Sequence, residues 1–143
     1  CQQQRLGRAC CGLVMLDIDH FKQINDRFGH QQGDRALQRF CACVAAQLRA
    51  DDLFVRSGGE EFLILLPGMS EPDLLALAER IRAAVAALPA DPAAFTVSLG
   101  TTLVRPGEEI NQALARADEW LYRAKRAGRN RVAHCPVATG AQG

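Results

Sequence analysis

The 143-residue sequence has no hydrophobic run long enough to cross a membrane. A transmembrane helix needs about 20 consecutive apolar residues, whereas the apolar residues here occur in short groups. The N-terminus also lacks the pattern of a secretory signal peptide. Because the chain does not start with methionine, we expect it to be part of a longer protein. These features predict a cytoplasmic domain and leave membrane anchoring of the parent protein open.

An excess of positive charge is also missing. The chain has 17 Lys and Arg residues against 16 Asp and Glu residues, a formal net charge of +1. Proteins that hold nucleic acids through the phosphate backbone are usually strongly basic, so a nucleic acid polymer is not an expected partner. The nucleotide-binding loops G-x-x-x-x-G-K-[ST] and G-x-G-x-x-G are absent as well.

The six cysteines form no C-x-x-C pair. Cys41 and Cys43 are two residues apart and would lie on different sides of a helix. We therefore interpret the cysteines as reduced thiols of a cytosolic protein. A zinc site or a disulfide framework is the alternative.

Short apolar runs separated by glycine and proline predict alternating strands and helices. Strands are expected near residues 12–16, 53–55, 62–66, 95–99 and 131–134. Helices are expected over 21–28, from near 33 to 48, from 71 to 88 after an N-cap at Ser70, and over 110–124. The continuous apolar run at 13–16 is typical of a strand buried on both faces, whereas residues 95–99 alternate and predict one face on the core. This order predicts a ferredoxin-like, palm-type α+β fold with helices flanking a mostly antiparallel sheet.

The segment 56–62 joins two of these strands and contains two glycines followed by two acids. Gly58 and Gly59 are expected to form a tight hairpin turn through positive φ angles, and they leave the tip open to a ligand. Glu60 and Glu61 then start the second strand and are expected to point to opposite faces. Two acids beside a bare turn favour the binding of a cation and a phosphate.

Asp17 ends the buried strand, so it would meet Glu60 if the two strands are neighbours. Mg²⁺ prefers oxygen ligands and retains waters, so one or two carboxylates plus substrate phosphates suffice to bind it. Metal held in this way supports phosphoryl transfer. The alternative for Asp17 is a simple cap of the following helix.

Lys22, Asn25 and Asp34 follow the acidic strand end. Lys22 would reach a phosphate, while Asn25 and Asp34 would read a guanine edge, because an aspartate accepts hydrogen bonds from the ring N–H and the amino group. Lys125 and Arg129 flank the end of the last helix and would clamp phosphates. The alternatives are solvated helix residues, with Asp34 as a cap, and cations that complement the helix dipole.

These residues belong to an ordered series of motifs. The series is Asp17-Ile18-Asp19-His20-Phe21-Lys22, Ile24-Asn25-Asp26, Gly29-His30, Gly33-Asp34, Ser57-Gly58-Gly59-Glu60-Glu61-Phe62, Ala117-Asp118, Tyr122-Arg123-Ala124-Lys125 and Gly128-Arg129-Asn130. In content and spacing it resembles the GGDEF family of diguanylate cyclases, over residues 12–132. The resemblance implies a nucleotide cyclase-like fold and the condensation of two GTP molecules into cyclic di-GMP with release of two pyrophosphates.

The resemblance also implies a role for each site residue. Asp17, Glu60 and the carbonyl of Ile18 would bind Mg²⁺ or Mn²⁺, two ions per site, and Glu60 would be the general base. Guanine and the phosphates would be held by a set that comprises Lys22, Asn25, His30, Asp34, Gly58, Gly59, Lys125 and Arg129. Lys22 would also assist catalysis. Each domain binds one GTP, so a homodimer with apposed half-sites is expected.

The segment Arg49-Ala50-Asp51-Asp52 fits the R-x-x-D inhibitory site of that family. Arg49 and Asp52 would bind the product, helped by Arg80 from the following helix, because arginine suits both phosphate and guanine. The alternative is a surface ion pair of little energetic weight.

The expected domain covers residues 1–135 and lacks the D-x-L-T-G-L-x-N-R segment that usually precedes it in the family, and residues 136–143 are expected to form a tail. An upstream sensor or receiver domain is implied for the parent protein. Two other functions stay open, namely an inactive receptor module for cyclic di-GMP and a different palm-type nucleotidyl transferase.

Overall fold

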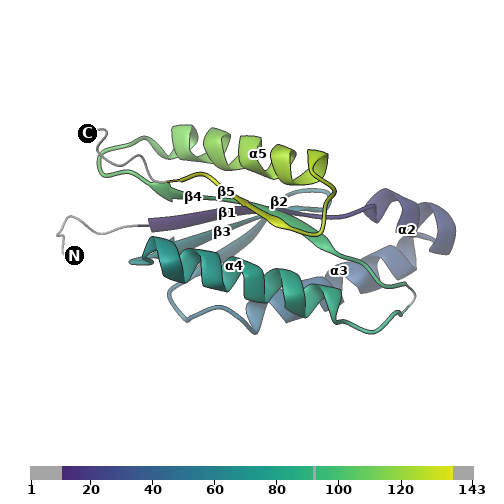
Figure 1. Ribbon diagram of the computed structural model, residues 1–143. Coiled ribbons are helices and arrows are strands. Elements are labelled where there is room, and N and C mark those ends of the chain that lie inside the picture. Colours follow the sequence, from purple (N-terminus) through teal and green to yellow (C-terminus); the bar gives the residue numbers. More distant parts are fainter. Residues whose placement is uncertain (1–10, 92, 137–143) are drawn as a thin grey trace.

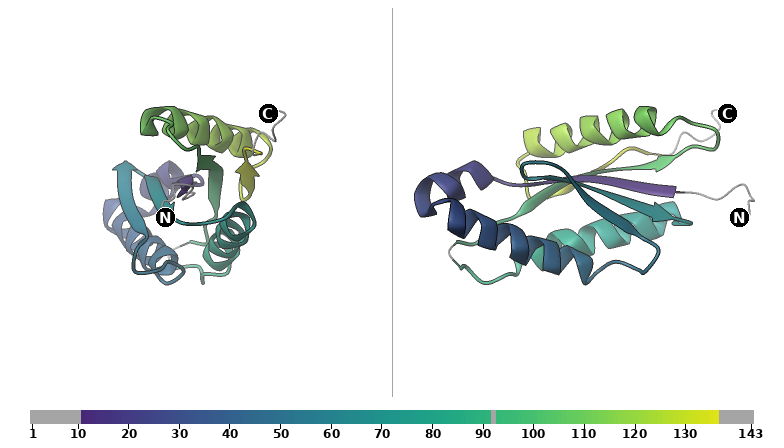
Figure 2. Two further views of the ribbon diagram at one scale, coloured as in Figure 1. Left: turned by 90° about the vertical axis from the view of Figure 1, so that its left-hand side faces the viewer. Right: turned by 180° about the vertical axis from the view of Figure 1, so that it is seen from behind.

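The computed structural model describes residues 11–91 and 93–136. Within these residues five strands form one sheet in the order β2-β3-β1-β4-β5. The elements in chain order are β1 (Cys11–Ile18), α2 (Phe21–Phe28), α3 (His30–Ala45), β2 (Leu53–Gly58), β3 (Glu61–Pro67), α4 (Glu71–Ala86), β4 (Val97–Val104), α5 (Ile110–Arg126) and β5 (Val132–His134). Helix α5 covers one face of the sheet, and α3 and α4 cover the other (Figures 1 and 2).

The pairing of the strands confirms the predicted α+β fold with a mostly antiparallel sheet. Strand β1 pairs antiparallel with β3 and with β4, and β2 pairs antiparallel with β3. Only β4 and β5 run parallel among the described strands. Helix α2 lies beyond the end of β1, where the chain leaves the sheet (Figure 1).

Strand β1 is buried on both faces, as its continuous apolar run predicts. Leu13 and Met15 pack with α5, while Val14 and Leu16 belong to the larger core beneath α3 and α4. Because the middle of β1 is covered on both faces, a charged side chain fits only near the end of the strand, where Asp17 lies.

Strand β4 corrects the expectation that one of its faces is exposed. It is the second central strand, and its residues from Val97 to Thr102 are buried. The face with small and polar side chains is covered by α5, which comes so close that a Cβ at Gly100 would lie 2.2 Å from the backbone N of Leu121. The alternation of residue sizes therefore reflects helix packing and not solvent exposure.

Helix boundaries follow local signals with one exception. Ser70 accepts a hydrogen bond from the backbone N–H of Asp73 and caps α4, as predicted. Gly29, with φ of 91°, ends α2 and immediately precedes α3, which begins at His30 and not near Gly33. The two helices are thus separated by a single glycine, which permits the sharp change of direction.

The hairpin between β2 and β3 is present, but its glycines act differently from the prediction. Neither Gly58 nor Gly59 is among the described residues with a positive φ. The pairing instead shifts between Arg56 and Gly58, at an irregularity of the bulge type. A Cβ at either glycine would meet no described atom within 4 Å, so these positions leave open space above the turn.

The described residues contain no helix that is both long and apolar enough to span a membrane. Of the predicted tail, residues 137–143 lie outside the described residues, as do residues 1–10.

Candidate active site

The carboxylates gather where β1 ends beside the β2–β3 hairpin. Asp17 is the cross-strand partner of Glu61, and the backbone N–H of Ile18 donates to the carbonyl of Glu60 at 3.3 Å. The predicted neighbourhood of these two strand ends is therefore present. It follows from the sheet order, which places β3 directly beside β1.

A first hollow of about 190 Å³ opens at this point. It brings together the residues predicted for metal and phosphate binding, and its lining includes Asp17, Ile18, Lys22, Glu60, Lys125 and Arg129. Among the acids, Asp17 lies in β1 and Glu60 in the turn between β2 and β3. The cations come from the helical side, with Lys22 in α2, Lys125 in α5 and Arg129 in the turn after α5. Opposite charges from separate elements thus face one small space.

A second hollow of about 400 Å³ adjoins the first and shares Phe21, Lys22 and Glu60 with it. The predicted base-reading residues line this space, and the full lining is Phe21, Lys22, Asn25, His30, Asp34, Leu37, Arg56, Gly59 and Glu60. Gly58, at the end of β2, is not among these residues. The two hollows together have the size and the polarity for a nucleoside triphosphate, with the base among α2 and α3 and the phosphates beside the acids.

Asp17 lies in a largely buried and strongly charged environment. Desolvation raises the pKa of its carboxyl group above the ordinary value, and the neighbouring Glu60 and Glu61 raise it further. Lys125 opposes this effect through a hydrogen bond from Nζ to Oδ2 of 2.5 Å. A carboxylate held in this way has a strong tendency to bind a cation.

The donor set suits a hard cation that keeps part of its water. Within residues 11–91 and 93–136, no group of three or more His, Cys, Asp or Glu side chains is arranged to hold a metal ion by itself. Asp17, Glu60 and the carbonyl of Ile18 all border the first hollow. Two carboxylates and one carbonyl fit Mg²⁺ that takes its remaining ligands from phosphates and water.

The expected opposite orientation of Glu60 and Glu61 implies that only Glu60 shares a face with Asp17, and for Glu61 this implication is wrong. Because directly paired residues of antiparallel strands point to the same face, the pairing of Asp17 with Glu61 places both side chains on one face. The side chains that share a face are set by the register between β3 and β1, and the assumed tight turn did not determine this register. Glu61 therefore contributes negative charge to the environment of Asp17.

Two residues that shape the site were missed by the sequence reasoning. Arg56 lines the second hollow and donates from Nε to the carbonyl of Gly59 at 2.7 Å, which ties the turn to β2. The buried Asp19 accepts hydrogen bonds from Thr96, from Ser98 and from the backbone N–H of Asn130. Asp19 thereby holds the loop that carries Arg129. The position of Asp19, two residues after Asp17, was the sequence signal that could have indicated this role.

Arg49 and Asp52 of the predicted inhibitory site follow the C-terminal end of α3, whereas the base-reading Asp34 lies near its N-terminal end. Arg49 donates from Nη2 to Asp52 at 2.6 Å and to the carbonyl of Pro67 at 2.9 Å. Desolvation raises the pKa of Asp52, but the hydrogen bonds from Arg49 outweigh it and the pKa is lowered. Arg80 of α4 donates to Gln47, two residues before Arg49.

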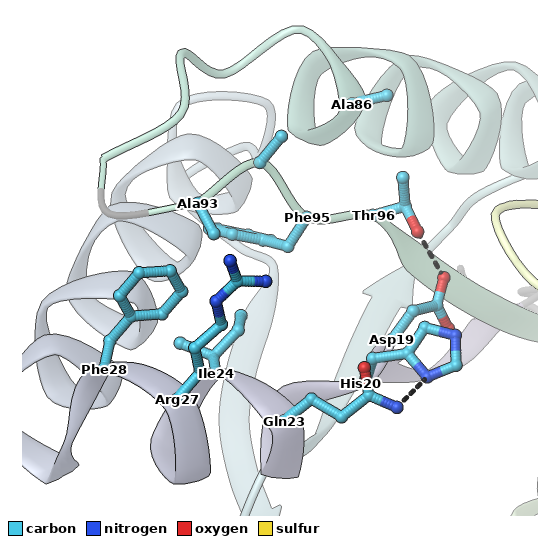
Figure 3. A pocket seen from close by; sticks show the side chains of 11 residues that line it. Asp19, His20, Gln23, Ile24, Arg27, Phe28, Ala86, Ala93, Phe95 and Thr96 are labelled. Carbon is cyan, nitrogen blue, oxygen red and sulfur yellow. Dashed lines mark hydrogen bonds between the residues drawn. The ribbon is translucent and has the colours of Figure 1, made fainter.

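A further hollow of about 340 Å³ lies between α2 and the segment before β4. Figure 3 shows the guanidinium of Arg27 among Phe28, Ala93 and Phe95 in this space. None of the predicted site residues lines it, although Asp19 and His20 border both this hollow and the first one.

Comparison with known proteins assigns the chain and its fold to one family. The model of the family "Diguanylate cyclase, GGDEF domain" matches residues 1–131. The chain belongs to the GGDEF family. The resemblance of its motifs is thereby confirmed.

Individual GGDEF proteins agree with this assignment. The diguanylate cyclase DgcP of Pseudomonas aeruginosa is 47% identical over 124 residues, which cover 84% of this chain and 18% of DgcP. The GGDEF domain of DgcB from Caulobacter crescentus, solved with c-di-GMP, superposes with a TM-score of 0.85 at 35% identity, over 94% of this chain and 82% of that one. An active GGEEF domain of a diguanylate cyclase from Vibrio cholerae superposes with a TM-score of 0.85 at 34% identity, over 93% and 86%. The chain spans 18% to 30% of the length of the curated relatives DgcP and PleD, so it corresponds to one part of such proteins.

Proposed function

We propose that this GGDEF domain is the catalytic domain of a diguanylate cyclase that condenses two GTP molecules into cyclic di-GMP and two pyrophosphates. The observation that carries the proposal is the pair of adjoining hollows, one lined by Asp17, Glu60 and Lys125 and the other by Asn25 and Asp34. The first has the charges for metal and phosphates, and the second has the hydrogen-bonding groups for guanine.

Each proposed role follows from the position of the side chain. Asn25 and Asp34 read guanine at the wider end, and His30 and Gly59 complete that space. At the narrower end the cationic groups hold the phosphates, and these are Lys22, Lys125 and Arg129. Gly58 keeps the turn free of side chains, so the nucleotide approaches the backbone closely.

Asp17, Glu60 and the carbonyl of Ile18 would hold Mg²⁺ or Mn²⁺, with two ions per site. When bound, the metal neutralises phosphate charge and favours loss of the proton from an attacking hydroxyl group. Apart from one proton transfer, the proposed reaction demands positioning and charge compensation from the protein.

The reaction balances as two equivalent transfers. The 3′-oxygen of one GTP forms a bond to the α-phosphorus of the other, the bond from that phosphorus to the bridging oxygen breaks, and pyrophosphate leaves. Glu60 accepts the proton of the 3′-hydroxyl group. Because one domain provides one nucleotide site, a second copy must supply the other GTP, and the active form is a homodimer with facing sites.

Product inhibition is a further part of the proposal. Arg49, Asp52 and Arg80 would bind cyclic di-GMP away from the active site, and Arg49 already forms several hydrogen bonds there. The guanidinium fork of arginine matches both phosphate and the guanine edge. Binding of c-di-GMP to a solved relative, the DgcB domain, supports product recognition by this fold. A regulatory sensor or receiver domain upstream is proposed for the parent protein.

Incubation with GTP and Mg²⁺ tests the proposed activity. We expect the chain, fused to a dimeric coiled coil, to form cyclic di-GMP, identified by chromatography. Glu60→Gln should abolish synthesis, and Glu119→Gln, an exposed control on α5, should retain it. Without the coiled coil, the rate should rise more steeply than in proportion to protein concentration. Absence of product from the dimeric protein, together with binding of cyclic di-GMP, would show a receptor module instead.

A further inference from the structure

Gly33 is a buried glycine in the first turns of α3, where this helix packs against α2. A Cβ atom built at this position would lie 1.7 Å from Oδ1 of Asn25 and 2.9 Å from its Cγ. Both distances are too short for real atoms, so the carboxamide of Asn25 occupies the space that any side chain at position 33 would need. The next contact, with Phe21 Cζ at 3.4 Å, is an ordinary one.

The overlap concerns the end of a side chain and not the backbone. A methyl group at position 33 would displace the carboxamide of Asn25 by rotation about its side-chain bonds, and the two helices would keep their positions. This differs from Gly100, whose Cβ would meet the backbone of α5. The consequence at position 33 is therefore local, and it falls on a residue that lines the second hollow.

Helix stability does not explain a glycine at this position. Alanine is favoured over glycine inside a helix, so the chain loses helix stability by having Gly33. Asp34, the next residue, lines the same hollow as Asn25. Asp34 thus provides its carboxylate to the hollow, and Gly33 leaves room for the carboxamide of Asn25.

We propose that Gly33 is a positioning residue that determines nucleobase specificity, because it leaves the space in which the Asn25 carboxamide is held toward guanine. The inference rests on the proposed function, in which Asn25 and Asp34 read the base. Gly33 itself is not among the residues that line the second hollow.

Binding measurements on four proteins test this inference: the wild type, Gly33→Ala, Asn25→Ala and the double variant. The probes are α,β-methylene GTP and α,β-methylene ATP with Mg²⁺, in which the bond that the reaction breaks is blocked. Gly33→Ala should raise the Kd of the guanine probe about tenfold, as expected for the loss of one or two hydrogen bonds, and leave the Kd of the adenine probe within about twofold. Gln38→Ala, an exposed change in the same helix, should alter neither Kd.

The double variant separates positioning from a purely structural role. In the Asn25→Ala background the clashing atoms are gone, so Gly33→Ala should leave the Kd of the guanine probe unchanged. It should also raise the Tm by about 4 °C through helix propensity. The inference is overturned if Gly33→Ala weakens the guanine probe equally in both backgrounds, if it leaves guanine binding intact in the wild type, or if the double variant melts below Asn25→Ala. A wild type without preference for the guanine probe refutes the proposed function itself.

Discussion

Replacement of Lys125 by methionine should have opposite effects on metal binding and on nucleotide binding. The ammonium group of Lys125 lies 2.5 Å from Asp17 Oδ2, on the carboxylate proposed to bind the metal. In the chain without nucleotide, Lys125 therefore neutralises part of the charge that a metal ion would otherwise use. The proposed binding of metal and GTP would require this group to move from Asp17 toward the phosphates.

The size of the effect follows from the charges. Two unit charges about 4 Å apart repel each other by about 4 kcal/mol at an effective dielectric constant of about 20. The side chain of Lys125 is 30% exposed, so the ammonium group can move toward water, and we expect about one third of this repulsion to remain. About 1.4 kcal/mol corresponds to a tenfold change in affinity. Lys125→Met should thus tighten metal binding without nucleotide about tenfold and weaken binding of the GTP complex.

Titration with Mn²⁺ in the absence of nucleotide, followed by the electron paramagnetic resonance signal of the free ion, measures the first effect. Calorimetry with α,β-methylene GTP measures the second. Arg129→Met is the matched control, because Arg129 lines the same hollow but forms no hydrogen bond or ion pair with Asp17 in the described part of the chain. The reasoning is refuted if Lys125→Met binds Mn²⁺ no more tightly than the wild type, or if Arg129→Met tightens it equally.

Three further predictions concern stability and control. Hydrogen bonds from Arg116 lower the pKa of Glu108 from 4.5 to about 2, so the unfolded chain takes up this proton first as the pH falls. The free energy of unfolding should drop by about 3 kcal/mol between pH 5 and pH 2 from this group, and Glu108→Gln should remove that part of the slope in urea titrations. Arg49→Ala should raise the concentration of cyclic di-GMP needed for half inhibition about tenfold and leave the initial rate within about twofold. The control variant Arg35→Ala should change neither quantity. Unchanged inhibition of the Arg49→Ala variant would contradict the proposed inhibitory site. Gly100→Ala would place its Cβ 2.2 Å from the α5 backbone, and should lower the free energy of unfolding by about 3 kcal/mol. Thermal melting measures this loss, and a melting curve equal to that of the wild type would contradict the prediction.

Features that depend on a few consecutive residues were predictable from the sequence. The Ser70 cap, the helix from Phe21 to Phe28 and its end at Gly29 are of this kind. Each is determined by backbone groups within one helical turn, and the residues that satisfy those groups are neighbours in the chain. The buried strand β1 was predictable for a similar reason, since a strand covered on both faces has no polar positions to interrupt its apolar run.

Relations between distant segments were less accessible. The pairing that places Glu61 across from Asp17 depends on the register between β3 and β1, and a change of one residue would reverse every side chain of the strand. The burial of β4 on both faces depends on α5, which follows it in the chain and packs onto Gly100. No local pattern reports either relation.

The candidate site shows the same division. By itself the sequence determined which chemical groups are available, because acids, amide, lysines and arginine occur in motifs of defined spacing around Asp17, Asn25 and Glu60. Only the tertiary structure decided that these groups line two adjoining hollows. It also decided that Lys125 forms an ion pair with Asp17, and that the carboxamide of Asn25 fills the space that a side chain at position 33 would need. The physical reason is that charge pairing and steric exclusion act through space, between atoms that the chain order leaves far apart.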